Sequence, residues 1–340
     1  MRALIAGPGG EGRLTEVPEP EPGPGQVLVE IRHASVNFSD LRHMSHLPEG
    51  TVLGYDAAGI VLRAAEDGTG PAVGARVAAF GPGVWAERAV FGTDAVAVVP
   101  ADVDLATAAA LPMAGLTALR SLRAAGLNVP PRTPGTPAPH PLQPTGTPAA
   151  PPPGAAGSGV RVLVTGASGA VGRLAVQLAA LAGAHVIASV SHPGRARDLT
   201  ARRAGTDAPG TVEVVTGLDG VDPVHVVVEV LGGPTLVTAW GLLEPGGNLQ
   251  SIGWASGEDA VFVPNSTFSL GEARSLSSFG DVTAPAADLA QLLALMETGD
   301  LAVDVGLRVP WERPAEAQTA QLARTASGKI VLDVTSHQHP

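Results

Sequence analysis

Val162-Leu-Val-Thr-Gly166-Ala-Ser-Gly169-Ala-Val-Gly172 is a short apolar run that leads into three glycines, each separated from the next by two residues. The apolar run predicts a buried β-strand, and the largely apolar stretch from 170 to 182 predicts a helix. Glycines at such a junction let the backbone approach a pyrophosphate, while the helix N-terminus supplies N–H donors and a positive dipole. The pattern therefore predicts a dinucleotide-binding turn, with a purely structural tight turn as the alternative.

Strands and helices alternate after this turn. The expected strands are residues 185–190, 212–215, 224–230, 247–252, 275–279 and 329–334, and residues 285–298 are an expected helix. Near-continuous apolar strands separated by helices are typical of a parallel sheet that helices cover on both faces. We therefore expect an α/β fold with a doubly wound parallel sheet.

The residues after the second expected strand indicate which dinucleotide is bound. A site for NAD usually places Asp or Glu there to hold the ribose diol, whereas this chain has Ser191, His192, Arg195 and Arg197 before the first carboxylate, Asp198. Hydroxyl, imidazole and guanidinium groups suit a 2′-phosphate, so we expect NADP(H) to be favoured and Ser191, His192 and Arg195 to bind it. The alternative is that the arginines belong to a solvated helix.

Two further regions precede the turn. Within the first 100 residues, 26–32, 57–63 and 75–80 read as strands between Gly- and Pro-rich turns, which predicts a small β-rich domain. Residues 127–158 are dense in proline, which removes backbone donors and cannot form a helix or an inner strand. We expect an exposed insert there; a docking site for a proline-recognising partner is the alternative.

Composition excludes several classes of function. The chain has 340 residues, with 21 Lys and Arg against 32 Asp and Glu, a net charge of −11, and no cluster of basic residues. Nucleic-acid binding needs a concentrated positive surface, so we expect no nucleic-acid partner. The absence of cysteine excludes disulfides, Cys-ligated zinc and thiol nucleophiles. The longest apolar stretch, 171–190, is interrupted by polar residues, so we expect no membrane span and a cytoplasmic protein.

Five stretches are spread through almost the whole chain outside the proline-rich segment. They are Ala34-Ser-Val-Asn37-Phe-Ser-Asp40, Leu53-Gly-Tyr-Asp56-Ala-Ala-Gly-Ile-Val61, Ala110-Leu-Pro-Met-Ala-Gly-Leu-Thr117-Ala118, the glycine run, and Ser327-Gly-Lys329-Ile-Val-Leu332. Together they resemble the medium-chain dehydrogenase/reductase superfamily, and within it the zinc-free quinone oxidoreductases. The resemblance implies a GroES-like β-rich domain of residues 1–121 and 283–340 and a Rossmann domain of residues 122–282, with the active cleft between them.

The resemblance also implies site residues. Asn37 is expected to line the nicotinamide end of the site, and the hydroxyl of Tyr55, the only tyrosine, to polarise the substrate; a packed aromatic is the alternative for Tyr55. The residues expected to bind the cofactor, besides the three after the second strand, are Thr117, Gly166, Ala167, Ser168, Gly169, Ala170, Val171, Gly172, Ile252, Gly253 and Lys329.

No metal is expected. Zinc-dependent relatives hold the metal with a Cys in the segment that matches residues 37–40 and with a His in the segment that matches Gly54-Tyr55-Asp56, and this chain has neither. A histidine-only site formed by His33, His43 and His46 is the remaining alternative.

The resemblance implies an NADPH-dependent oxidoreductase that transfers hydride to a quinone or an activated C=C bond of a small molecule. Reduction of an enoyl thioester or a polyketide-type intermediate is the second possibility. An NADPH-binding sensor or structural protein with little turnover is a third, from another class. Relatives often form dimers through the last strand of the dinucleotide sheet, so we expect a homodimer that pairs residues 275–279.

Overall fold

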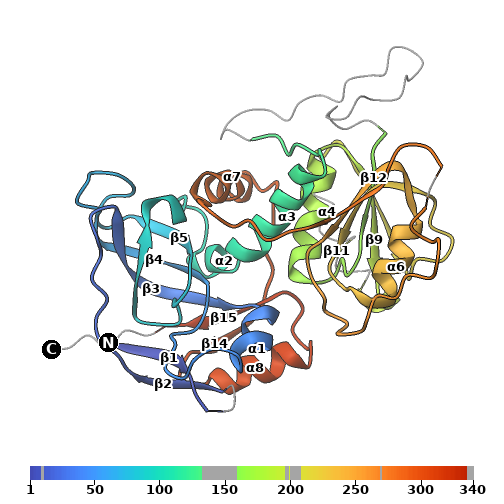
Figure 1. Ribbon diagram of the computed structural model, residues 1–340. Helices are drawn as coiled ribbons and strands as arrows, with labels where there is room; N and C mark the ends of the chain where they lie inside the picture. Colours follow the sequence, from blue (N-terminus) through green and yellow to red (C-terminus); the bar gives the residue numbers. More distant parts are fainter. Residues whose placement is uncertain (9–10, 132–158, 196–198, 200–207, 269, 335–340) are drawn as a thin grey trace. The chain divides into compact units, whose positions relative to one another are not determined.

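The computed structural model describes residues 1–8, 11–131, 159–195, 199, 208–268 and 270–334 (Figure 1). The chain divides into two compact units. Unit 1 comprises Met1–Leu116, Val282–Glu297 and Ala302–Pro340, and unit 2 comprises Thr117–Asp281 and Thr298–Leu301. The expected boundaries, at 121/122 and 282/283, lie near these divisions.

Most of the expected proline-rich insert, 132–158, lies outside the described residues. At its beginning, however, Leu127 and Val129 are 8% and 4% exposed. The Leu127 N–H donates to the carbonyl of Leu122 at 2.9 Å, which ties this segment to the preceding helix. The expectation of exposure from 127 onward was therefore wrong for these residues, because two apolar side chains are packed before the prolines accumulate.

Unit 1 is built on antiparallel strands. Its described strands are β1 (Arg2–Ala6), β2 (Gly12–Glu16), β3 (Gln26–Val36), β4 (Asp56–Arg63), β5 (Arg76–Phe80), β6 (Arg88–Gly92), β7 (Val96–Val98), β14 (Val305–Pro310) and β15 (Lys329–Asp333). In the described part, the larger sheet has the order β14-β15-β3-β4-β5-β7, β6 also pairs with β3, and β1 and β2 form a ribbon of their own. Every pair in the larger sheet is antiparallel except β14 with β15.

Helices complete this unit. They are α1 (Phe38–Met44), α2 (Leu105–Ala109), α7 (Ala286–Glu297), α8 (Pro314–Leu322) and the first turns of α3 (Pro112–Ala124), with a short 3₁₀ turn at Thr93–Ala95. Helix α8 contacts α1 and lies over β14 and β15.

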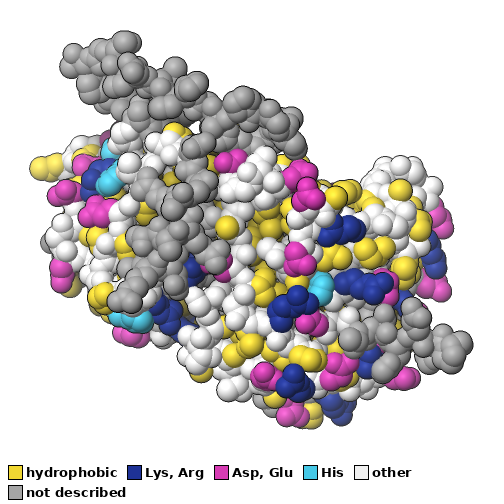
Figure 2. Space-filling model, turned by 180° about the vertical axis from the view of Figure 1, so that it is seen from behind, with side chains coloured by type: hydrophobic (Ala, Val, Ile, Leu, Met, Phe, Trp, Pro, Cys, Tyr) yellow, Lys and Arg dark blue, Asp and Glu magenta, His cyan; other side chains and the backbone are white. Residues whose placement is uncertain are grey.

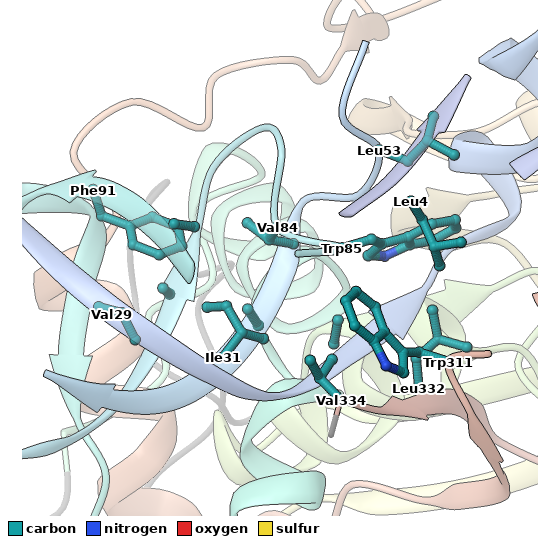
Figure 3. Packing of buried hydrophobic residues seen from close by; sticks show 14 of the residues in the cluster. Leu4, Val29, Ile31, Leu53, Val84, Trp85, Phe91, Trp311, Leu332 and Val334 are labelled. Atoms are coloured by element: carbon teal, nitrogen blue, oxygen red, sulfur yellow. The ribbon is translucent and has the colours of Figure 1, made fainter. Parts of the chain in front are cut away.

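The core of unit 1 gathers around two fully buried indole rings, Trp85 and Trp311, which are 1% and 0% exposed. Figure 3 shows Leu4 and Leu53 beside Trp85, and Leu332 beside Trp311. Gly54 has φ +86°, and a Cβ there would lie 2.0 Å from the Trp85 ring. The glycine therefore permits the close approach of the indole to the segment just before β4, whose first residue is Asp56.

Unit 2 contains a sheet of parallel strands. They are β8 (Arg161–Val164), β9 (His185–Val190), β10 (Thr211–Thr216), β11 (Val224–Glu229), β12 (Leu243–Ser251) and β13 (Ser275–Ser278). Their order in the described residues is β10-β9-β8-β11-β12-β13, and all pairs are parallel. Counted from β8, this is the 3-2-1-4-5-6 order of a doubly wound dinucleotide fold. The expected α/β fold with a parallel sheet is confirmed.

Two helices of unit 2, α4 (Ala170–Leu181) and α6 (Gly233–Gly241), flank the strands in Figure 1, and a 3₁₀ turn spans Pro193–Arg195. The face drawn in Figure 2 carries basic side chains interspersed with acidic ones over the described residues. Within those residues, no helix combines the length and the apolar character that crossing a membrane requires.

Candidate active site

The glycine run forms the connection from β8 to α4, as its sequence predicts. Gly166 has φ +56°, a left-handed conformation that a side chain disfavours, and the backbone then turns so that Gly169 becomes the N-cap of α4. Ala167 donates its N–H to the carbonyl of Ser189 at 3.0 Å, which fixes the turn to the neighbouring strand β9. The expected cofactor residues Ala170, Val171 and Gly172 lie in the first turn of α4.

Gly172 brings the helix close to the turn. A Cβ on this residue would lie 2.4 Å from the carbonyl oxygen of Gly166 and 2.7 Å from the Cα of Ala167, both backbone atoms. The third glycine of a dinucleotide-binding turn has this packing role. The side chain of Arg173 also fixes the turn to the helix, because its Nε donates a hydrogen bond to the carbonyl of Ser168 at 2.8 Å. The turn therefore has the close packing of helix against turn that a dinucleotide-binding fold requires; its contact with a pyrophosphate stays a prediction.

The expected phosphate-binding residues after β9 approach this turn. Arg195 Nε lies 3.3 Å from His192 Nε2, and Arg195 Nη1 lies 3.5 Å from the hydroxyl of Ser168. Ser191 and His192 are exposed. The structure thus brings together Ser168, His192 and Arg195 from two separate stretches of sequence. Residues 196–198, which include Arg197, lie outside the described part.

Glu229, a residue for which no role was predicted from the sequence, holds the neighbouring loop. Its buried carboxylate accepts from Thr165 Oγ1 at 2.9 Å and from the N–H groups of Leu231 and Gly232 at 2.9 and 2.8 Å. Burial raises the pKa of Glu229, and these hydrogen bonds oppose the rise. The signal was present in the sequence as a carboxylate at the end of an apolar run, with the glycine pair Gly232-Gly233 following after two further residues.

Ile252 and Gly253, also expected at the cofactor, follow β12. Ile252 donates its N–H to the carbonyl of Glu229 at 2.9 Å, and a Cβ on Gly253 would lie 2.8 Å from the carbonyl oxygen of Val230. Both therefore lie at the same carboxyl edge of the sheet as the glycine turn, where ligands bind in doubly wound folds. Thr117 is buried on α3, with 8% exposure.

A second polar cluster is buried in unit 1, and sheet register places its members. Ser35 on β3 pairs with Asp56 on β4, and Val36 pairs with Ile330 on β15. The residues next to that second pair are Asn37 and Lys329. Strand pairing therefore brings Asn37, Asp56 and Lys329 together from three distant parts of the chain.

The cluster is densely hydrogen-bonded. Asp56 Oδ2 accepts from Ser35 Oγ at 3.1 Å, Asn37 Nδ2 at 3.0 Å and Lys329 Nζ at 3.1 Å. Its Oδ1 accepts from the backbone N–H of Met113 at 2.9 Å. Lys329 Nζ also donates to Asn37 Oδ1. Because Asp56 and Lys329 are 0% and 3% exposed, this is a buried ion pair with satisfied partners.

Asp40 joins the cluster through Asn37. Its Oδ2 accepts from the backbone N–H of Asn37 at 2.8 Å and from Asn37 Nδ2 at 3.2 Å. The first of these bonds is the reciprocal contact of a capping box at the start of α1. Burial, and then the nearby Asp56 carboxylate, raise the pKa of Asp40 to about 7. No role was predicted for Asp40 or Asp56 from the sequence, although both stand in the stretches that carry the family resemblance.

Tyr55 does not join this hydrogen-bonded cluster. Its side chain is 37% exposed, and its ring stacks on Phe80 with 6.1 Å between centroids. The geometry is compatible with the packed-aromatic alternative, and its catalytic role stays a prediction. Lys329, expected at the cofactor, is instead held by Asn37 and Asp56; its contact with a cofactor also stays a prediction.

In the described part of the chain, the residues at the position of the relatives' zinc site do not fit a zinc ion. Within the described residues, no group of three or more His, Asp or Glu side chains could hold a metal. His43 and His46, proposed above for a histidine-only site, have ring centroids 6.5 Å apart. The position of the metal-binding His of zinc-dependent relatives is occupied by Tyr55, whose neutral phenol is a poor zinc ligand.

Comparisons with known proteins add independent evidence. A family model described as "Zinc-binding dehydrogenase" matches residues 170–298, and one described as "Alcohol dehydrogenase GroES-like domain" matches residues 23–101. The quinone oxidoreductase of Pseudomonas aeruginosa is 29% identical over 331 residues, which cover 92% of each protein. The spectinabilin polyketide synthase system protein NorB of Streptomyces orinoci is 31% identical over 344 residues, which cover 97% of this chain but 14% of that protein.

A solved structure of the quinone oxidoreductase from Thermus thermophilus, described together with its complex with NADPH, superposes with a TM-score of 0.75 at 25% identity, covering 98% of this chain and 100% of that one. The GroES-like match covers strands β3 to β7 of unit 1, and the dehydrogenase match covers α4 and strands β9 to β13 of unit 2. The chain belongs to the medium-chain dehydrogenase/reductase superfamily of oxidoreductases, in its quinone oxidoreductase-like branch.

Proposed function

We propose that the chain is an NADPH-dependent reductase that transfers hydride to a quinone or an activated C=C bond without a metal. The proposal rests mainly on one observation: Arg195, which follows β9, lies close both to His192 and to Ser168 in the glycine turn. These groups donate hydrogen bonds where a dinucleotide fold places the adenosine ribose, and no carboxylate among the described residues there competes for a 2′-phosphate.

Different residues of the chain bind the cofactor and the substrate in this proposal. The turn from Gly166 to Gly172 offers backbone N–H groups and the N-terminus of α4 to the pyrophosphate. Glu229 holds the loop after β11 in place through two backbone N–H groups. NADPH, when bound, supplies the hydride. We assign substrate binding to the polar cluster of unit 1, where hydrogen bonds hold the Asn37 amide on both its oxygen and its nitrogen, and to the neighbouring Tyr55, whose side chain is partly exposed.

A second candidate function is reduction of an enoyl thioester or a polyketide intermediate. It is favoured by the 31% identity to a polyketide synthase protein, of whose length the chain spans only 14%. A cofactor-binding protein with little turnover is a third candidate, from a different class. The three differ in which acceptor, if any, drives oxidation of NADPH.

An acceptor screen separates these candidates. NADPH oxidation by the purified chain, treated with a chelator, is followed against quinones, simple enones and enoyl thioesters. We expect quinones or enones to give the highest kcat/KM. Preference for thioesters would favour the second candidate, and NADPH binding without turnover on any acceptor would favour the third and contradict the reductase proposal.

The cofactor assignment predicts the behaviour of Arg195→Ala. Loss of a charge-assisted hydrogen bond to the 2′-phosphate should weaken NADPH binding by about 1.5–3 kcal/mol, or roughly tenfold or more. NADH lacks this phosphate, so its Kd should hardly change. Titration of both cofactors into wild type, Arg195→Ala and Arg63→Ala, an exposed control, tests this. Equal losses for both cofactors would place Arg195 in a structural role instead.

We also propose a homodimer that forms through β13, the last strand of its sheet in the described residues. An edge strand has unpaired backbone groups on one side, which a second copy can satisfy. Leu276 on this strand is 45% exposed. Light scattering should show a dimer for the wild type and a shift toward monomer for Leu276→Lys, which sets two like charges at the paired edges; a monomeric wild type contradicts the proposal.

A further inference from the structure

The two carboxylate oxygens of Asp40 differ in their hydrogen bonding. Its side chain is buried, at 7% exposure, and Oδ2 accepts two hydrogen bonds from Asn37. Oδ1 is also buried and has no hydrogen-bond partner among the described residues. A carboxylate oxygen left bare in this way carries a desolvation cost, which a proton on that oxygen would reduce.

The charge balance of the cluster also favours a protonated Asp40. Two carboxylates, Asp40 and Asp56, face a single ammonium, Lys329, and all three are buried. Asp56 uses both oxygens in hydrogen bonds and contacts Lys329 directly, so the ion pair is complete without Asp40. Asp40 is therefore the group whose neutralisation leaves the cluster with no net charge.

We propose that Asp40 is a positioning residue that works as a neutral carboxylic acid, with its proton on Oδ1, and that in this form it holds the Asn37 amide for the reduction. This role rests on the proposed function. Asn37 Nδ2 is shared between Asp40 Oδ2, at 3.2 Å, and Asp56 Oδ2, at 3.0 Å. An ionised Asp40 attracts this amide more strongly and competes for the Lys329 ammonium, so the amide turns away from its working orientation.

The charged groups around Asp40 come from several elements. Asp56 on β4 raises its pKa, and Lys329 on β15 lowers it. On α1 itself, Arg42 and His43 follow Asp40. Helix α8, which contacts α1, carries Glu316. The guanidinium of Arg324, just beyond α8, lies over the ring of Phe38, 5.5 Å from its centroid. Burial is the largest influence, and it keeps the pKa of Asp40 at about 7.

The test compares pH profiles of the NADPH-dependent reaction. In the wild type, kcat should fall by about tenfold for each unit of pH above the pKa of Asp40, if the ionised form is inactive. Asp40→Asn keeps an acceptor for both Asn37 donors and has no proton to lose, so its kcat, whatever its level, should no longer fall over this range. Asp40→Leu removes the acceptor and should lower kcat at every pH, with a smaller change in KM. Asp102→Asn, an exposed carboxylate, is the matched control and should follow the wild-type profile.

A second measurement does not depend on activity. A buried protonated carboxyl gives its own C=O stretching band in infrared difference spectra, which should be present in the wild type below the pKa of Asp40 and absent in Asp40→Asn. The proton also links to stability: between the ordinary pKa of 3.8 and about 7, the folded chain holds a proton that the unfolded chain has released. Raising the pH through this window therefore lowers the Tm of the wild type relative to Asp40→Asn.

The outcomes are distinguishable. An alkaline decline of kcat that persists in Asp40→Asn, or the absence of a carboxyl band that this variant removes, overturns the positioning role even if the enzyme is an active reductase. A wild type with the band and the shifted Tm, but with no turnover on any acceptor, leaves the protonated Asp40 standing and contradicts the proposed function; the positioning role then falls with it.

Discussion

Lys329→Met is expected to destabilise the folded chain by about 3–5 kcal/mol, the range found when one partner of a buried ion pair is removed. Lys329 is the only ammonium in contact with Asp56, and both side chains are buried, at 3% and 0% exposure. Met has a similar length but leaves Asp56 as a buried anion without its cation. Chemical denaturation of wild type and variant measures the difference.

Two further variants serve as controls for this measurement. Arg308→Met breaks an ion pair with Asp333 whose arginine is 49% exposed, so its cost should stay within about 1 kcal/mol. Adding Asp56→Asn to Lys329→Met removes the buried, uncompensated negative charge of Asp56 and should recover part of the lost stability. If Lys329→Met lowered the free energy of unfolding no more than Arg308→Met does, the buried ion pair would not contribute to stability as its burial indicates.

Gly172→Ala is the second variant with a large expected effect. Alanine is a better helix former than glycine by about 1 kcal/mol, yet its Cβ would meet the backbone of Gly166 at 2.4 Å. Because backbone atoms cannot step aside, α4 must move away from the turn, at a cost of about 1–3 kcal/mol. We expect NADPH and NADH to lose affinity equally, by about tenfold or more, since both carry the pyrophosphate.

Gly241→Ala supplies the matched control for this substitution. Gly241 also lies in a helix, α6, and a Cβ there meets nothing within 4 Å. This variant should bind both cofactors like the wild type and be equally stable or slightly more so. Wild-type affinity in Gly172→Ala would show that the turn does not cradle the pyrophosphate.

The parallel sheet was largely predictable because its strands are apolar runs bounded by breakers. The predicted strand 185–190 coincides with β9, and the predicted helix 170–182 differs from α4 by one residue. Strand β14 was missed, since it alternates exposed and partly buried residues around Gly306 and Arg308 and lacks a continuous apolar signal. Helix α3 was missed although the sequence carries its signal, a proline at the first helical position, Pro112, and leucines at helical spacing, Leu116, Leu119 and Leu122.

The glycine turn of unit 2 and the polar cluster of unit 1 differed in how far the sequence could predict them. The glycine turn is local, so a single stretch of sequence contains the whole signal. The cluster of Asn37, Asp40, Asp56 and Lys329 depends on the register of β3 with β4 and β15, which joins residues nearly 300 positions apart. Burial of Asp40 and its raised pKa follow from that packing, and no sequence pattern encodes them.

Metal-independent hydride transfer from NADPH to a small acceptor has a defined stoichiometry that can be measured. The purified chain, freed of metal by a chelator and checked by elemental analysis, is mixed with NADPH and the best acceptor from the screen, and NADPH consumed and product formed are both measured. We predict one NADPH consumed per molecule of two-electron-reduced product, at a rate unchanged by chelation. Product formation that disappears with the metal and returns on adding zinc would show that the hydride transfer depends on a metal.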